Sequence, residues 1–390
     1  MLPIISAFTP LVILPSLSRA LGSSGWSSLA VGYSIGSFSA LIVNLAWNID
    51  GPGRAAAAST EDRLRLFRTS VSSRSTVSFV MLPVAALLAY LTAPSLPGGA
   101  ALMAAATALA GALPSWYFIA LSRPGSLALF DTIPRFLAAL AASLLLMVYR
   151  SEFVYPAILL ITLLVSVVAS CLWVTGQALI LPTRDDIVIL RKNAFLVLST
   201  VIQSGYTSLA VLIVAIVSPT IVPLFAAVTR FRDFGVSGLV ALTNALQGWV
   251  SEVPSERERH RRRRRGFMLN ATAAFAVGAA VAIGLPVVDR WFFGEAVQVD
   301  YSSSSLAGVS IQLIGMSMAA TYYVLAPRGR TNTVAASGIL TTLIGVPLLI
   351  VLTQRGGAHG GLAAIALAET ISLAVQLIAW GRMTRRDTQG

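Results

Sequence analysis

Cysteine, lysine, histidine and acidic residues are all scarce in this chain of 390 residues. The single cysteine, Cys171, lies in an apolar run, which excludes an intramolecular disulfide. No cluster of cysteine and histidine has the spacing of metal ligands, so we expect no metal site. A phosphate-binding loop of the form G-x-x-x-x-G-K-[ST] is also missing, and nothing in the sequence indicates a cofactor.

Charged residues make up only 11% of the chain, against 56% hydrophobic residues. An average soluble domain has about 25% charged residues, so this composition is typical of an integral membrane protein. The apolar stretch at residues 2–17 lacks a basic n-region and a cleavage site, and we therefore expect a first membrane span there rather than a removed signal peptide.

A bilayer core of about 30 Å requires about 20 apolar residues per helix. Segments of this kind predict an all-α protein with twelve transmembrane helices. They cover residues 2–20, 25–48, 75–93, 98–120, 126–148, 154–180, 194–217, 220–249, 267–288, 304–326, 333–353 and 362–381.

The distribution of basic residues supports this layout and predicts that both termini are cytoplasmic. Of the 28 basic residues, only four fall in segments expected outside and three within spans, and the cytoplasmic segments hold the rest, among them Arg74. The run "RERHRRRRRG" at residues 257–266 would suggest nucleic-acid binding in a soluble protein. Here it is the cytoplasmic loop between spans 8 and 9, with a secondary attraction to anionic lipid headgroups, and we expect no nucleic-acid partner.

An internal similarity divides the chain in half. Residues 21–31 and 217–227 share a pattern of small turn residues followed by an apolar helix, and their offset of about 196 residues is half the chain. We therefore expect two six-helix bundles, residues 1–182 and 183–390, that run the same way through the membrane.

Span 8 carries the most informative polar residues, because ionisable groups within a bilayer usually face a partner or a water-filled cavity. Arg230, Asp233, Ser237 and Asn244 share one helical face, and Arg232 adds a second cation. We expect an anion site on this face. The alternative is a neutral bridge between Arg230 and Asp233, although one acid cannot neutralise both arginines.

Two other spans contain charged residues. In span 5, Asp131 and Arg135 have the i,i+4 spacing of an internal ion pair. In span 12, Glu369 has no basic residue within a turn, so it is a candidate for proton or ion coupling, with a hydrogen bond to an adjacent helix as the alternative.

Amide side chains on two further spans suit the hydroxyl groups of a sugar. These are Asn44 and Asn48 in span 2 and Gln203 in span 7. Hydrogen bonds between helices explain such residues almost as well.

The stretch "LPSWYFIALSRPGSLALFDTIPRFLAALAA", residues 113–142, resembles the polysaccharide transporter (Wzx-like O-antigen or teichoic acid flippase) branch of the MOP (MATE-like) superfamily. The matching positions are Pro114, Trp116, Tyr117, Phe118 and Arg135, whereas the family often has glycine where this chain has Ala120. Residues 17–36, 217–233 and 360–369 also look similar to this family.

The resemblance implies a multi-pass flippase of the bacterial plasma membrane. Such a protein moves a polyprenyl-pyrophosphate-linked oligosaccharide to the outer leaflet by alternating access. Its partners would be this lipid-linked substrate, the membrane lipids, and glycan polymerases or glycosyltransferases of the same pathway. Arg230 and Arg232, together with Arg135 and Arg19, would then offset the desolvation of the pyrophosphate.

Three alternatives belong to other classes. A multidrug or cation antiporter of the same superfamily would share the fold. A membrane glycosyltransferase or polymerase would need a cluster of acids or arginines on a long outer loop, which the sequence lacks, so we expect no enzyme. A major-facilitator transporter is suggested by "DGPGR" at residues 50–54, but the rest of that family's signature is not found.

Overall fold

The computed structural model describes residues 2–180, 184–251 and 256–387, and all regular elements within these ranges are helices. In this part of the chain, eight helices are long and apolar enough to cross a membrane. The predicted fold class, an all-α integral membrane protein, is confirmed. The count of twelve spans and the cytoplasmic position of the termini stay predictions.

Two of the eight helices are divided by a glycine with positive φ. Helix α1 (Leu2–Asn44) breaks at Gly22, with φ 67° and ψ −170°, and α13 (Thr331–Asp387) breaks at Gly357, with φ 56° and ψ −138°. Glycine adopts this conformation without the steric cost that a Cβ atom brings. Both breaks fall between segments that the sequence assigns to separate spans, which is one reason why eight helices correspond to a larger predicted number.

The chain divides into two compact units, Met1–Ala215 and Ile216–Gly390. Their border lies within α9 (Arg184–Val217), about 30 residues after the division predicted at residues 182 and 183, which stays a prediction. The first unit contains, besides α1 and most of α9, the elements α2 (Trp47–Ala57), α3 (Thr60–Thr92), α4 (Pro97–Leu109), η1 (Ala110–Ala112), α5 (Ser115–Ala120), α6 (Pro124–Leu127), η2 (Ala128–Thr132), α7 (Ile133–Val148) and α8 (Val154–Thr175).

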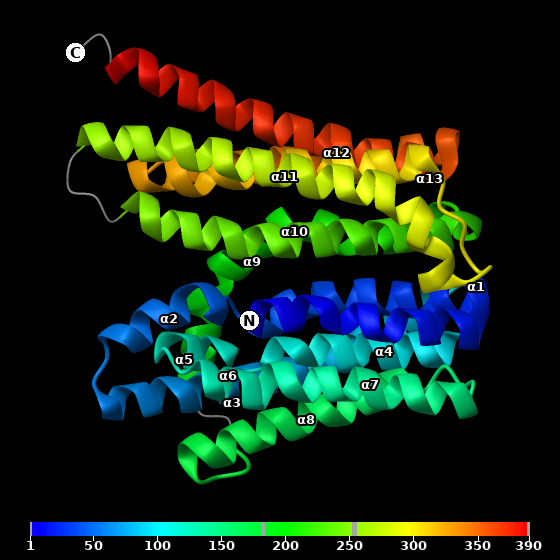
Figure 1. The fold of residues 1–390 in the computed structure, drawn as a ribbon. Helices are drawn as coiled ribbons and strands as arrows, with labels where there is room; N and C mark the ends of the chain where they lie inside the picture. The colour runs from blue at the N-terminus through cyan, green and yellow to red at the C-terminus, as the bar shows by residue number, and fades with distance from the viewer. Residues whose placement is uncertain (1, 181–183, 252–255, 388–390) are drawn as a thin grey trace. The chain divides into compact units, whose positions relative to one another are not determined.

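Small residues let α1 and α4 of the first unit pack closely. A Cβ atom on Gly32 would lie 2.3 Å from the carbonyl oxygen of Ala100, and one on Gly36 would lie 2.6 Å from that of Ala104. Figure 1 shows α1, α4, α7 and α8 running along one another in this unit. Such close contact between helices is typical of membrane bundles, where small residues lie at the interfaces.

The second unit contains the end of α9, η3 (Pro219–Ile221), α10 (Val222–Ser251), α11 (Glu256–Phe293), α12 (Tyr301–Ala319), η4 (Ala320–Leu325), η5 (Ala326–Arg328) and α13. Here the closest approach is between α11 and α12, where a Cβ atom on Gly278 or Gly308 would lie 2.5 Å from the other's carbonyl oxygen. Helices α10, α11, α12 and α13 extend alongside one another within the unit (Figure 1).

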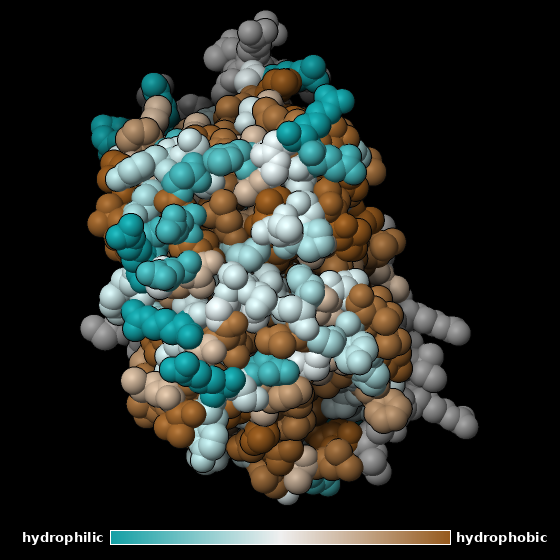
Figure 2. All heavy atoms as spheres, turned by 90° about the vertical axis from the view of Figure 1, so that its right-hand side faces the viewer, coloured by the Kyte–Doolittle hydropathy of each residue, from teal (hydrophilic) through white to brown (hydrophobic). Residues whose placement is uncertain are grey.

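Large apolar side chains point outward from the helices. Leu144 and Met147 of α7 and Ile161 and Val165 of α8 are all at least 60% exposed, as expected for helices that contact lipid. Figure 2 looks onto the helix ends at the right-hand side of Figure 1, where hydrophilic side chains gather and hydrophobic ones appear at the margins.

Candidate functional site

Helix α10 of the second unit holds an ion pair on the face predicted as an anion site. The Nε and Nη2 atoms of Arg232 donate to Oδ1 of Asp233 at 3.1 and 2.8 Å. Arg232 is buried, with 4% of its surface exposed, whereas Arg230 is half-buried. This ion pair joins Asp233 to its chain neighbour Arg232.

The remaining polar residues of this helix face outward. Asp233, Ser237 and Asn244 are exposed along α10, and the side chain of Asp233 is 53% exposed. A carboxylate or amide that faced lipid at this depth would be costly. The exposed polar face of α10 therefore indicates contact with water or with a polar ligand.

Glu369 of α13 lies within electrostatic range of Arg232 and is half-buried. The sequence shows no base within a turn of Glu369 because the cation comes from another helix. Arg230, Arg232, Asp233 and Glu369 together carry two positive and two negative charges. Proton uptake by one of the two acids would leave a net positive charge on these four side chains. Within the described residues, no three His, Cys, Asp or Glu side chains gather as a metal site.

In the first unit, the predicted ion pair between Asp131 and Arg135 is present. Asp131 lies in the π-helix η2 and Arg135 in the first turn of α7. The hydroxyl group of Ser115 also donates to Oδ2 of Asp131 at 2.6 Å. These charges are used within the unit, and a contact of Arg135 or Asp131 with substrate stays a prediction.

The other predicted residues lie apart from α10 in the chain and make local contacts. Arg19 and Arg150 line a cavity of about 250 Å³ formed by α1, the end of α7 and the turn after it. The side-chain amide of Asn44 donates to a carbonyl oxygen of η1 at 3.4 Å and its oxygen accepts from the backbone N–H of Asn48 at 3.2 Å. These bonds engage the side chain of Asn44, whereas the side chain of Asn48 is exposed, and sugar contacts of both residues stay predictions. The side chain of Gln203 lies outside the described part of the chain.

Sequence reasoning missed the structural role of Arg74, which lies within α3 and is fully buried. Its guanidinium donates to the carbonyl oxygens of Ser70, Leu113 and Gly111 at 3.0, 2.8 and 3.4 Å. The carbonyls of Gly111 and Leu113 are open to these bonds because the helix is interrupted between α4 and α5, around Pro114. The signal in the sequence was an arginine next to an apolar span, together with a proline inside the following one.

The aromatic residues that carry the family resemblance form a buried cluster. Trp116 is fully buried, stacks on Trp47 at a centroid distance of 5.0 Å and donates from Nε1 to the hydroxyl of Ser70 at 3.0 Å. Tyr117 and Phe118 belong to the same core. These residues therefore stabilise the unit and do not form a ligand site.

Another ionic contact that the sequence did not predict joins α13 to the start of α12. Nε2 of His359, two residues after the break in α13, lies 2.9 Å from Oδ2 of Asp300. Asp300 also caps α12 by accepting from the backbone N–H groups of Ser302 and Ser303 at 3.0 and 3.1 Å. Partial burial raises the pKa of Asp300, but the hydrogen bonds from His359 and Ser303 outweigh burial and hold this pKa well below its usual range.

No protein-family model matches the chain, and no curated protein matches it. Solved structures do match over nearly the whole chain. The inward closed conformation of the lipid II flippase MurJ has a TM-score of 0.65 and 13% identity, covering 97% of this chain and 85% of that one. The inward-facing conformation of a multidrug resistance MATE family transporter of the MOP superfamily has a TM-score of 0.58 and 17% identity, covering 98% and 94%.

A MATE structure in the bent conformation aligns with all of this chain and 95% of its own, with a TM-score of 0.51 and 16% identity. At such identities the likeness concerns the fold. The chain therefore has the fold that the lipid II flippase MurJ shares with the multidrug resistance MATE transporters of the MOP superfamily.

Proposed function

We propose that the chain is a flippase that moves a polyprenyl-pyrophosphate-linked oligosaccharide from the cytoplasmic to the outer leaflet of a bacterial plasma membrane by alternating access. The observation that carries the proposal is the buried Arg232 beside the exposed polar face of α10. The fold is in keeping with it, since a flippase for a lipid-linked substrate has the same fold. Glycosyltransferases and a glycan polymerase of the pathway would supply and consume this substrate.

Arginine suits the pyrophosphate of such a substrate. A guanidinium presents five N–H donors in a planar fork that fits phosphate oxygens. Asp233 accepts two of the donors of Arg232 and so fixes the orientation of the side chain. Arg230 adds a second cation two residues away, and the amide of Asn244 is available for sugar hydroxyl groups.

Export of an anion has a driving force that requires no ATP. A membrane potential that is negative inside favours outward movement by about 2.3 kcal/mol per charge and 100 mV. Glu369 is the residue that we propose for proton or ion coupling. When Glu369 is protonated, Arg232 has one anionic neighbour fewer and attracts the pyrophosphate more strongly.

An antiporter for cationic drugs is the second candidate, because multidrug resistance MATE transporters have this fold too. A cationic substrate would prefer the acids Asp233 and Glu369, whereas the pyrophosphate would prefer the arginines. An enzyme that uses a lipid-linked sugar finds no support in the solved structures above, which are transporters and a flippase.

The test is leaflet transfer of a fluorescent lipid-linked oligosaccharide in liposomes that contain the purified protein. We expect Arg232→Gln to slow transfer at least about tenfold, the cost of one charge-assisted contact to phosphate. Arg290→Gln removes an exposed charge at the end of α11 and should leave transfer unchanged. Glu369→Gln should tighten binding of the pyrophosphate and remove the pH dependence of transfer.

Two outcomes contradict the proposal. If the wild-type protein transfers no lipid-linked sugar but extrudes cationic dyes, the antiporter is correct. If Arg232→Gln and Arg290→Gln transfer the lipid at the wild-type rate while both remain folded, α10 is not the site of the pyrophosphate.

A further inference from the structure

The five consecutive arginines at residues 261–265 have different surroundings. Arg262 contacts Trp249 of the preceding helix. Its Nη1 atom donates to the carbonyl oxygen of Trp249 at 2.8 Å, and its guanidinium lies 5.0 Å from the centroid of the Trp249 ring. Arg261 and Arg265 are exposed. Arg263 and Arg264 line a pocket, and Arg263 is 7% exposed. The run is therefore not a uniform basic patch.

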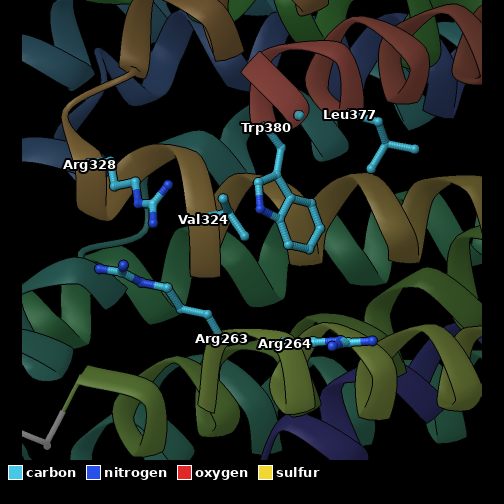
Figure 3. A pocket seen from close by; sticks show the side chains of 7 residues that line it. Arg263, Arg264, Val324, Arg328, Leu377 and Trp380 are labelled. Atoms are coloured by element: carbon cyan, nitrogen blue, oxygen red, sulfur yellow. The ribbon is translucent and has the colours of Figure 1, made fainter. Parts of the chain in front are cut away.

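This pocket has a volume of about 310 Å³ and is formed by α11, the turn at the end of α12 and the last turns of α13. Three of its lining side chains are the arginines Arg263, Arg264 and Arg328, and the others are Val324, Leu377 and Trp380, with Gly381 completing the wall. Figure 3 shows Arg263 and Arg328 pointing toward one another, with the Trp380 ring between Val324 and Leu377 and Arg264 extending in the opposite direction.

The apolar side of the pocket is held by the core of the second unit. Trp380 packs against Phe267 at a centroid distance of 5.1 Å, and Val324 is 1% exposed within the same core cluster. Val324 belongs to the π-helix η4, and Arg328 follows in the turn η5. The backbone that carries the arginines is thus held by a packed core. This packing lowers the conformational entropy that is lost when an anion binds.

We propose that this pocket binds the phosphate of an anionic phospholipid in the cytoplasmic leaflet. Arg263 and Arg328 point toward one another, and a phosphate between two guanidinium groups accepts charge-assisted hydrogen bonds from both. The three apolar side chains of the pocket can contact the first methylene groups of a lipid, whereas a free anion has no apolar part for them to contact. The positive-inside rule places residues 257–266 and Arg328 at the cytoplasmic surface, where basic pockets between membrane helices bind anionic headgroups.

This site is separate from the arginines of α10, and its occupancy is measured without transport. The protein is purified into nanodiscs of phosphatidylcholine with increasing phosphatidylglycerol, and bound phosphatidylglycerol is measured by native mass spectrometry, with the melting temperature as a second readout. The test variant is the double substitution Arg264→Gln with Arg328→Gln. The matched control is Arg261→Gln with Arg265→Gln, which removes the same charge from the same surface.

We expect the test variant to retain phosphatidylglycerol at least about tenfold less well, since one charge-assisted hydrogen bond to a phosphate contributes about a factor of ten or more. The control should lose clearly less. Leu377→Gln should weaken lipid retention while all three pocket arginines remain. An equal loss in test and control variants would show diffuse attraction and overturn the proposal.

Inorganic phosphate distinguishes the lipid from a free ion. If millimolar phosphate stabilises the wild-type protein but not the test variant, and phosphatidylglycerol has no such effect, the pocket takes a free anion and the lipid proposal is wrong. If phosphatidylglycerol alone has the effect, the proposal holds whether or not the chain transfers lipid-linked sugars.

Discussion

In the first unit a buried cation satisfies backbone carbonyls at a helix interruption, whereas in the second unit a neutral amide joins three core helices. In the first unit, Arg74 is fully buried against backbone carbonyls and Arg135 is paired with Asp131. In the second unit, the amide of Asn270 accepts from the hydroxyl of Thr243 at 3.0 Å and donates to a carbonyl of α12 at 2.8 Å. Arg74 and the pair of Asp131 and Arg135 thus serve the structure of the first unit, whereas the exposed polar face of α10 is where we propose that a ligand binds.

The physical reason lies in the cost of burial. A neutral amide with all its hydrogen bonds is cheaper to bury than an ion, so charge remains in a bundle core only where it satisfies several acceptors at once. Arg74 satisfies acceptors that a proline-interrupted helix leaves open. Asn270 connects α10, α11 and α12 without an ion, and the exposed face of α10 stays free of that structural task.

The largest effect is expected from Arg74→Leu, which leaves the carbonyl of Leu113 without its donor and that of Gly111 with only the amide of Asn44. We expect a loss of about 3 kcal/mol in the free energy of unfolding, because hydrogen bonds from charged groups contribute about 1.5 to 3 kcal/mol each. Thermal melting in detergent measures it. Arg68→Leu, at an exposed position of the same helix, should change stability by less than about 0.5 kcal/mol. Similar melting temperatures of both variants would mean that Arg74 does not stabilise the helix interruption between α4 and α5.

A smaller effect is expected from Asn270→Leu in the second unit. This change removes the partner of Thr243 and of the carbonyl of Gly315, and hydrogen bonds within membrane bundles contribute about 1 to 2 kcal/mol at most. Asn244→Leu is the matched control, because Asn244 is exposed on α10. Asn270→Leu should lower the melting temperature, and Asn244→Leu should slow lipid transfer without lowering it. If Asn244→Leu lowered the melting temperature and Asn270→Leu did not, Asn270 would not be a structural amide and Asn244 would not belong to a binding face.

Features that depend on one helix were predictable from the sequence. Apolar length predicted the membrane helices, the gaps between predicted spans contain the breaks at Gly22 and Gly357, and the i,i+4 spacing predicted the pair of Asp131 and Arg135. These follow from helical geometry, which relates residues a few positions apart.

Features that depend on two helices were not predictable in the same way. The role of Arg74 was missed because two of its three acceptors lie 37 and 39 residues away in the sequence. Glu369 appeared to have no cation nearby because Arg232 is on another helix. The pairing of Arg232 with Asp233 was missed for a different reason: helical spacing gives the direction of a side chain, but long side chains can turn back to a neighbour in the sequence.

The smallest effect is expected from Asp300→Asn at the contact between α12 and α13. The pKa of Asp300 is lowered in the folded protein, so its ionised form stabilises the fold at neutral pH, and this stabilisation is lost as the pH falls below the unfolded value of about 4. The side chain is 45% exposed and screened by solvent, so we expect less than about 1 kcal/mol. Asparagine caps a helix about as well as aspartate. The substitution therefore removes the charge and keeps the cap. The difference in melting temperature between wild type and Asp300→Asn should therefore narrow as the pH falls from 6 to 3, and a constant difference would show that the carboxylate acts only as a cap.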